Sequence, residues 1–254
     1  MRPLYLKGAD ARVELDGPAL KVRHPERADV WFPLQRVSRV VSDSRVGWAM
    51  PALMACAGGG ITVTFLADDG AVLARLVGQP GERAEIRQRL RDALLRPDWP
   101  ARYADWRAGM QRMALRSVAR RIGMGVGQPP TPRALHQALQ AAARDRDLLP
   151  AYTAAGRALH ALVHSQTLQA LQDAGIAPDD HDWPGFDLTH DLTDLLFWDL
   201  HLARLAWLGA RRRCGQPDPP DSAAVVAFFE QRRARLDHLL TSLIGRLHRW
   251  LIEL

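Results

Sequence analysis

The chain has 254 residues, 47% of them hydrophobic and 24% charged, a composition typical of a globular protein that buries a sizeable core. Its net charge is +6, and arginine supplies nearly all of the positive charge because Lys7 and Lys21 are the only lysines. The planar guanidinium matches phosphate oxygens two at a time, so the bias fits a nucleic-acid partner, but a high-GC genome explains it equally well.

Two classes of protein are disfavoured at the outset. The longest apolar stretches, residues 51–56 and 192–198, fall far short of the roughly 20 apolar residues that cross a bilayer, so no transmembrane helix is expected. The amino terminus has no secretory signal pattern, which predicts a cytoplasmic protein. Cys56 and Cys214 are far apart in sequence, so we expect reduced thiols and neither a disulfide framework nor a cysteine zinc site.

The first eighty residues are typical of short strands joined by tight turns. Residues 13–15 and 20–22 flank Asp16 and Gly17, which predicts a hairpin. Residues 61–65 alternate apolar and polar side chains as a half-buried strand does, and a turn at Asp69 and Gly70 leads to a further strand over 72–76. A short apolar helix is expected from Pro51 through residue 56, ended by three glycines.

From residue 82 onward the pattern becomes helical. Ile86, Leu90 and Leu94 are spaced for one apolar face of a helix, which Pro97 and Pro100 end. Further helices are predicted over residues 101–122, 133–146, 151–174, 189–209 and 221–252. Strands followed by helices predict an α+β protein, with a small N-terminal β-domain over 1–80 and a larger all-helical C-terminal domain over 81–254.

The densest group of acids and histidines lies at the start of the helix over 189–209. Asp191 and Asp194 are one helical turn apart, so both carboxylates can face one point, as a hard divalent cation requires. His190 shares a face with Asp194. The alternative interpretation is structural, because Thr189 suits a helix cap and acids in a first turn complement the helix dipole.

Two other patterns have a possible chemical meaning. His160 and His164 stand at i and i+4, a spacing that can present two imidazoles to one metal, although packing or surface roles are the usual explanation. Arginines recur every four residues in the helix over 101–122, where Asp105 is the only acid. This stripe predicts either a solvated face or a phosphate-binding face, formed by Arg112, Arg116, Arg120 and the adjacent Arg121.

Several of these segments resemble one family. In the first half they are residues 4–6, the hairpin at Asp16 and Gly17, residues 32–41, and residues 60–66 before an aspartate-glycine turn. In the second half they are residues 160–166, 174–178 and 185–186, followed by the motif His190-Asp191-Leu192-Thr193-Asp194. In order and spacing they are similar to the CRISPR adaptation integrases of the Cas1 family, as far as about Leu208.

The resemblance implies a β-domain that forms a homodimer and a helical domain that holds a catalytic Mg²⁺ or Mn²⁺ by a glutamate, a histidine and an acid. Asp191 and Asp194 match the acid positions of the family motif. The family histidine is absent after Gly185 and Phe186, so His190, or else His181, is its expected substitute. The resemblance places Gln140 where the family has glutamate, and a neutral amide lacks the charge that a hard metal needs.

Three functions follow as hypotheses. The first is a Cas1-like, DNA-binding subunit with a degenerate metal site and little or no nuclease activity, working in spacer acquisition beside Cas2 and an active Cas1 copy. The second is an active divalent-metal-dependent endonuclease and integrase, in which His190, Asp191 and Asp194 are joined by His160 or His164. The third is an unrelated helical-bundle metal phosphohydrolase.

Overall fold

The computed structural model of the chain describes residues 2–78, 84–123, 130–176, 182–183 and 186–254. The chain divides into two compact units. One comprises residues 1–88 with 164–187 and carries the sheets, and the other comprises residues 89–163 with 188–254 and is helical. The α+β fold class is therefore confirmed. The predicted domain boundary at residue 80 stays a prediction; among the described residues, 84–88 and 164–176 group with the sheets.

The first sheet of the strand unit has the order β1-β5-β7-β8. Its strands are β1 (Arg2–Leu6), β5 (Val37–Asp43), β7 (Thr62–Leu66) and β8 (Val72–Leu76). β1, β5 and β7 run parallel, whereas β7 and β8 form an antiparallel pair. Gly70 in the turn between them has a φ of +82°, a conformation that glycine adopts without steric cost. The two predicted strands over 61–65 and 72–76 are confirmed.

The second sheet has the order β4-β3-β2-β6 and contains the predicted hairpin. Its strands are β2 (Arg12–Asp16), β3 (Ala19–His24), β4 (Arg27–Pro33) and β6 (Gly47–Trp48). Val13 pairs with Val22, and Gly17 in the connecting turn has a φ of +57°. The short helix η1 (Leu34–Arg36) leads from β4 to β5. The predicted apolar helix is α1 (Met50–Gly58), with Pro51 in its first turn.

The core of the strand unit joins both sheets to α1. Val13, Val40 and Val63 are fully buried, together with Ala52 and Cys56 of the helix. Desolvation raises the pKa of the Cys56 thiol to about 11, so this cysteine is an unreactive core residue. A polar layer lies beside β7, where the backbone N–H of Thr62 donates to Gln169 Oε1 and the Thr64 hydroxyl donates to Ser165 Oγ.

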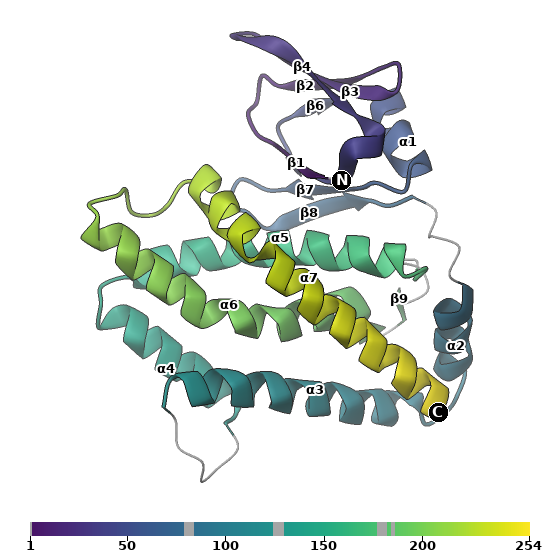
Figure 1. The fold of residues 1–254 in the computed structure, drawn as a ribbon, viewed down its shortest axis with the longest axis vertical. Helices are drawn as coiled ribbons and strands as arrows, with labels where there is room; N and C mark the ends of the chain where they lie inside the picture. Colours follow the sequence, from purple (N-terminus) through teal and green to yellow (C-terminus); the bar gives the residue numbers. More distant parts are fainter. Residues whose placement is uncertain (1, 79–83, 124–129, 177–181, 184–185) are drawn as a thin grey trace. The chain divides into compact units, whose positions relative to one another are not determined.

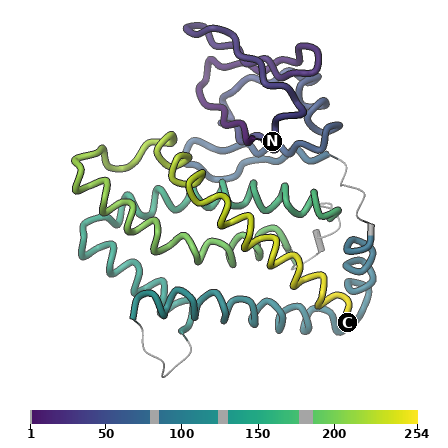
Figure 2. Tube along the Cα trace, in the orientation of Figure 1, coloured from purple at the N-terminus to yellow at the C-terminus, as the bar shows by residue number. Residues whose placement is uncertain are grey.

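The helical unit is built around α6 (Leu188–Arg213), which contacts α3, α4 and α7 (Figure 1). The other helices are α2 (Ala84–Leu94), α3 (Trp99–Arg121), α4 (Pro132–Arg144), α5 (Leu149–Asp173) and α7 (Ser222–Glu253). Only the part of α2 from Arg89 onward and the part of α5 up to Val163 belong to this unit. In Figure 2 the chain end lies near the segment that follows α2, and the Arg96 guanidinium donates to the Leu254 carbonyl.

Helix limits agree with the sequence expectations within a few residues. Pro100 lies in the first turn of α3 and does not break a helix, because proline suits a position whose N–H has no intrahelical acceptor. Asp221 accepts a hydrogen bond from the Ala224 N–H and caps α7. The predicted glycine-rich stretch over 123–127 lies, apart from Gly123, outside the described residues. The short pair β9 (Asp182–Trp183) and β10 (Phe186–Asp187) was not predicted.

A buried polar cluster joins α5 to α6 within the helical unit. The Tyr152 hydroxyl lies 2.8 Å from His201 Nδ1, and Arg204 stacks on the Tyr152 ring at 3.6 Å. His201 and Arg204 are 4% and 3% exposed, so both are removed from water. Gly156 gives the guanidinium its space, because a Cβ at this position would clash with Arg204 Nη1.

This cluster predicts a loss of stability in acid. Desolvation, with the charges of Arg204 and His136, lowers the pKa of His201 from 6.5 to about 3. Between pH 6.5 and about 3, His201 is therefore protonated in the unfolded chain and neutral in the folded chain. Because protonation stabilises only the unfolded chain, the free energy of unfolding should fall by a few kcal/mol as the pH is lowered through this range. Urea melts of the wild type and a His201→Asn variant at pH 7.5 and 4.5 test this. The variant should lose less stability than the wild type, and an equal loss in both would contradict it.

Candidate metal centre

The first turns of α6 position the acid and histidine motif. The helix begins at Leu188, directly after β10. Thr189 lies inside the first turn and not at a cap, and its carbonyl accepts a hydrogen bond of 2.7 Å from the Thr193 hydroxyl. The predicted capping role of Thr189 is therefore wrong. Leu192 and Leu196 are buried, which orients this end of α6 and turns Asp194 toward solvent.

Three side chains from two helices converge at this end of α6. His160 Nε2 of α5 lies 3.0 Å from Asp194 Oδ1, and His190 Nε2 lies 3.4 Å from Asp194 Oδ2. One donor atom from each of the three residues lies within 4.8 Å of the others, which is close enough for a shared metal ion. We call these three residues the HHD triad. The helix spacing of His190 and Asp194 predicts their approach, whereas the position of His160 depends on how α5 packs on α6.

Asp191 has partners other than the residues of the triad. Its side chain is 9% exposed, and its two oxygens accept hydrogen bonds from the Tyr103 hydroxyl at 2.9 Å and from Arg107 Nη1 at 2.7 Å. Both partners come from α3, one helical turn apart. A neutral and a cationic donor from α3 thus engage both oxygens of Asp191, and the prediction that Asp191 and Asp194 share one cation stays a prediction.

The two aspartates differ in acidity as well as in position. Burial is the largest effect on Asp191 and raises the pKa of that carboxyl, despite the hydrogen bond from Tyr103 and the charge of Arg107. Desolvation is also the largest single effect on Asp194, but the hydrogen bond from His160 and the charges of His190 and Arg107 together outweigh it. The pKa of Asp194 is consequently lowered, so this carboxylate is ionised at neutral pH.

The predicted pair His160 and His164 does not form one site. His160 is part of the HHD triad, and its ring packs edge-on against Phe197 at 5.2 Å between centroids. His164 is 5% exposed and belongs to the strand unit. His181, the other expected substitute for the family histidine, lies outside the described residues. His190 and His160 are thus the two histidines that the structure brings to Asp194.

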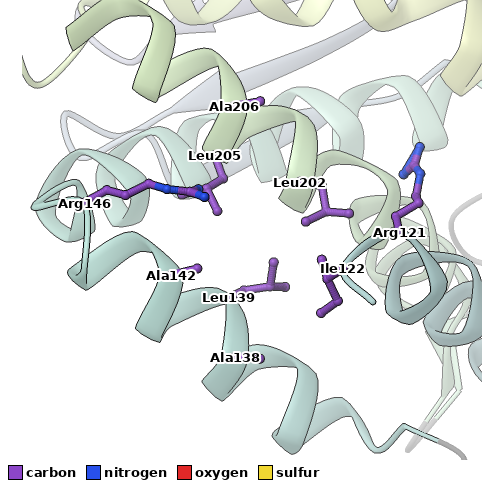
Figure 3. Close-up of a pocket in the computed structure, with 9 residues that line it drawn as sticks. All are labelled: Arg121, Ile122, Ala138, Leu139, Ala142, Arg146, Leu202, Leu205 and Ala206. Atoms are coloured by element: carbon purple, nitrogen blue, oxygen red, sulfur yellow. The ribbon is translucent and has the colours of Figure 1, made fainter. Parts of the chain in front are cut away.

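Gln140 lies on the exposed face of α4. Its neighbour Leu139 packs with Trp198 and lines a cavity of about 580 Å³ with Leu202 and Leu205 of α6 (Figure 3). Leu202 is eight residues beyond Asp194, or roughly 12 Å along the helix axis. These contacts place this part of α4 beside a later segment of α6 than the triad. The correspondence of Gln140 to the family glutamate stays a prediction.

The arginine stripe of α3 is exposed as expected. Arg112, Arg116 and Arg120 all face solvent, and no ion pair joins them to an acid in the part of the chain that the structure describes. Arg121 differs, because its Nη1 lies 3.5 Å from Asp199, which also accepts two hydrogen bonds of 2.6 Å from Arg235. The first three arginines are therefore available for phosphate oxygens, and Arg121 is partly neutralised.

Sequence reasoning missed Tyr103 and Arg107. Their spacing of four residues is an available signal, since it places both on one helix face. Nothing in the local sequence, however, identifies Asp191 as their partner 84 to 88 residues later. Arg107 also contributes to the lowered pKa of Asp194, so its charge acts on the triad as well.

The anchoring of Asp191 can be tested by removing one hydroxyl. Tyr103→Phe keeps the ring in its stack with Trp106, whose centroid is 5.6 Å away. It leaves a buried carboxylate oxygen without its donor, so we expect the free energy of unfolding to fall by about 1–3 kcal/mol. Chemical denaturation of the variant and the wild type under the same conditions measures this. An unchanged midpoint in Tyr103→Phe would show that the bond contributes nothing.

The donor set of the HHD triad suits a divalent cation. Imidazole nitrogens and a carboxylate oxygen are the ligands of many catalytic zinc and iron sites, which often use two histidines and one acid. Asp194 supplies the negative charge, and its side chain is 54% exposed, which leaves room for a water or a substrate oxygen. The residues present therefore fit a metal ion held by His160, His190 and Asp194.

Structure comparison identifies relatives of the same fold. The Cas1 protein TM1797 from Thermotoga maritima matches with a TM-score of 0.73 at 11% identity, over 99% of this chain and 97% of that one. A casposase bound to its integration product matches with a TM-score of 0.66 at 12% identity, covering 100% of this chain and 92% of the casposase. TtCas1 in complex with DNA gives 0.59 at 15% identity, over 98% and 90% of the two chains. Comparison with curated protein sequences finds no match.

The chain is thus an α+β protein with the fold of Cas1 proteins. One unit contains two sheets, and the helical unit contains the histidine and aspartate group. The family model described as CRISPR associated protein Cas1 matches residues 4–154, more than half of the sequence. The chain belongs to the Cas1 family. No helix in the described part of the chain is long and apolar enough to cross a membrane.

Proposed function

We propose that this chain is a DNA-binding integrase subunit for CRISPR spacer acquisition whose metal centre is the HHD triad. The observation that carries the proposal is the convergence of His160, His190 and Asp194 within 4.8 Å. It favours the active alternative over a degenerate one, because the expected losses of the family glutamate and histidine are offset by two imidazoles at the same aspartate. The family match also accounts for the N-terminal sheets, which a helical-bundle phosphohydrolase leaves unexplained.

The structural relatives support the reaction class. They include a casposase bound to an integration product, a Cas1 bound to DNA, and a complex of Cas6, reverse transcriptase, Cas1 and Cas2. For this chain we accordingly propose DNA as substrate and Cas2 as partner. From the family resemblance we further propose a homodimer through the strand unit and a cytoplasmic location.

Each residue of the site has a separate task in this proposal. A bound divalent ion stabilises negative charge on phosphate oxygens and lowers the pKa of a hydroxyl or water. His160 and His190 supply nitrogen ligands, and Asp194 supplies the charge. Arg107, fixed by Asp191 on one side, keeps its side chain 52% exposed and is placed to bind a phosphate oxygen of the DNA. Arg112, Arg116 and Arg120 follow the backbone of the duplex without reading its sequence.

A second candidate remains a catalytically degenerate subunit that binds DNA beside an active Cas1 copy. The engagement of both Asp191 oxygens by Tyr103 and Arg107 favours this candidate. Among the described residues this leaves one carboxylate in the triad, where the family has two acids. Both candidates retain the exposed arginines of α3, so both predict salt-dependent DNA binding.

A strand-transfer assay separates the two candidates. Repeat-containing DNA is incubated with a labelled spacer duplex, the protein and Mg²⁺, Mn²⁺ or Zn²⁺, with a chelator as control. The integrase proposal predicts joined product with at least one ion and none with chelator. Tight, salt-sensitive DNA binding with no product under any ion would support the degenerate subunit. Failure to bind DNA at all would contradict both candidates.

A further inference from the structure

The donor atoms of the HHD triad are unusual for a metal ion that catalyses a reaction at phosphate. Two of the three donor atoms are imidazole nitrogens, and the third is one carboxylate oxygen. Mg²⁺ is held in proteins through oxygen ligands, waters and substrate phosphates, and it gains most from sites with more than one negative charge. Imidazole instead suits zinc, iron, nickel and copper. The donor chemistry of this triad therefore disagrees with magnesium.

The charge around the triad strengthens this disagreement. Asp194 is its one acid, and the nearby Asp191 is already paired with Arg107 at 2.7 Å. A hard cation that depends on carboxylate charge thus finds a single carboxylate in the triad. A metal ion that forms strong bonds to imidazole nitrogen depends less on the negative charge of carboxylate ligands.

His160 is the residue that decides the ligand set. Its side chain is 32% exposed and packs against Phe197, so its ring is held in place before any ion binds. It comes from a different helix than His190 and Asp194, which share α6. Replacing this one nitrogen ligand by a carboxylate would convert the group to one histidine and two acids, the type that hard ions prefer.

We propose that the HHD triad selects a borderline divalent ion of the zinc and cobalt class over Mg²⁺, and that His160 sets this selectivity. The inference rests on the proposed function, because it assigns the metal class of the same site. It predicts an affinity order of Mg²⁺, Mn²⁺, Co²⁺ and Zn²⁺ from weakest to tightest, with Zn²⁺ more than about tenfold tighter than Mg²⁺.

Metal titration of the chelator-treated full chain tests the proposal without measuring activity. Isothermal titration calorimetry gives the affinity of each ion, and the visible spectrum of Co²⁺ reports its coordination by nitrogen. His160→Asp should narrow the ratio of Zn²⁺ to Mg²⁺ affinity by about tenfold or more. Asp194→Ala should abolish the Co²⁺ signal. His238→Asn, at an exposed histidine of α7, should change neither result. Thermal melts confirm that each variant is folded.

The titrations distinguish a failure of the metal selectivity from a failure of the metal centre. Equal affinities for Mg²⁺ and Zn²⁺ at a site that depends on Asp194 would overturn the selectivity and leave the metal centre intact. Zn²⁺ or Co²⁺ binding that is unchanged in both His160→Asp and Asp194→Ala would place the ions elsewhere and overturn the selectivity of the triad. Absence of binding by any ion would contradict the metal centre itself.

Discussion

Asp194→Ala is expected to reduce strand transfer by at least about a hundredfold, because a bound ion contributes several kcal/mol to stabilising the transition state and each 1.36 kcal/mol is tenfold in rate. The fold should survive, since the side chain is 54% exposed and its partners are the two histidines of the triad. The initial rate of product formation under the preferred ion measures the effect, with circular dichroism as the check on folding.

Asp105→Ala is the matched control for this experiment. Asp105 is an exposed aspartate of α3, and its removal changes the net charge by the same amount. The control should keep the rate of the wild type. If Asp194→Ala also kept that rate, the HHD triad would have no part in strand transfer, and the metal would have to be sought at residues outside the described ranges.

Simultaneous replacement of Arg112, Arg116 and Arg120 by glutamine is expected to weaken DNA binding strongly. Each phosphate contact contributes about 0.9 to the slope of log affinity against log salt, so the slope should fall by up to about three. At 150 mM salt we expect a loss of at least about tenfold in affinity. Glutamine favours helix nearly as well as arginine does, so α3 should remain intact.

The control for the arginine stripe removes the same charge from other places. Arg75, Arg213 and Arg249 are exposed and lie on three different elements. Fluorescence anisotropy with a branched duplex, repeated over a range of salt, compares the two triple variants. Both have a net charge three units below the +6 of the wild type. Equal losses in both would mean that the overall charge, and not the stripe, attracts the DNA.

Local patterns predicted most elements of the fold but not how they combine. The hairpin over 13–22 and the helices from residue 84 onward follow from periodicity and turn chemistry, which act between near neighbours. The division of the strands into two sheets does not, because Leu4 pairs with Val40 and Val40 with Val63 across long separations in sequence. Such pairings depend on which strands share a core, and a local pattern contains no information on this.

The same limit applies to the site. His190 and Asp194 are four residues apart on one helix, so their approach could be predicted. Asp191 fits the same pattern, yet Tyr103 and Arg107 from α3 engage both of its oxygens. His160 was proposed only as one of two replacement ligands, and the packing of α5 on α6 brings it to Asp194 while His164 stays buried elsewhere. Contacts between helices decide these positions.

The most direct test of the metal centre is anomalous diffraction from crystals soaked in Zn²⁺ or Co²⁺. We predict one strong peak about 2.0–2.2 Å from His160 Nε2, His190 Nε2 and a carboxylate oxygen of Asp194. Asp191 should still accept its hydrogen bonds from Tyr103 and Arg107. A peak centred on Asp191, or an HHD triad without a peak while ions bind at other positions, would contradict the account.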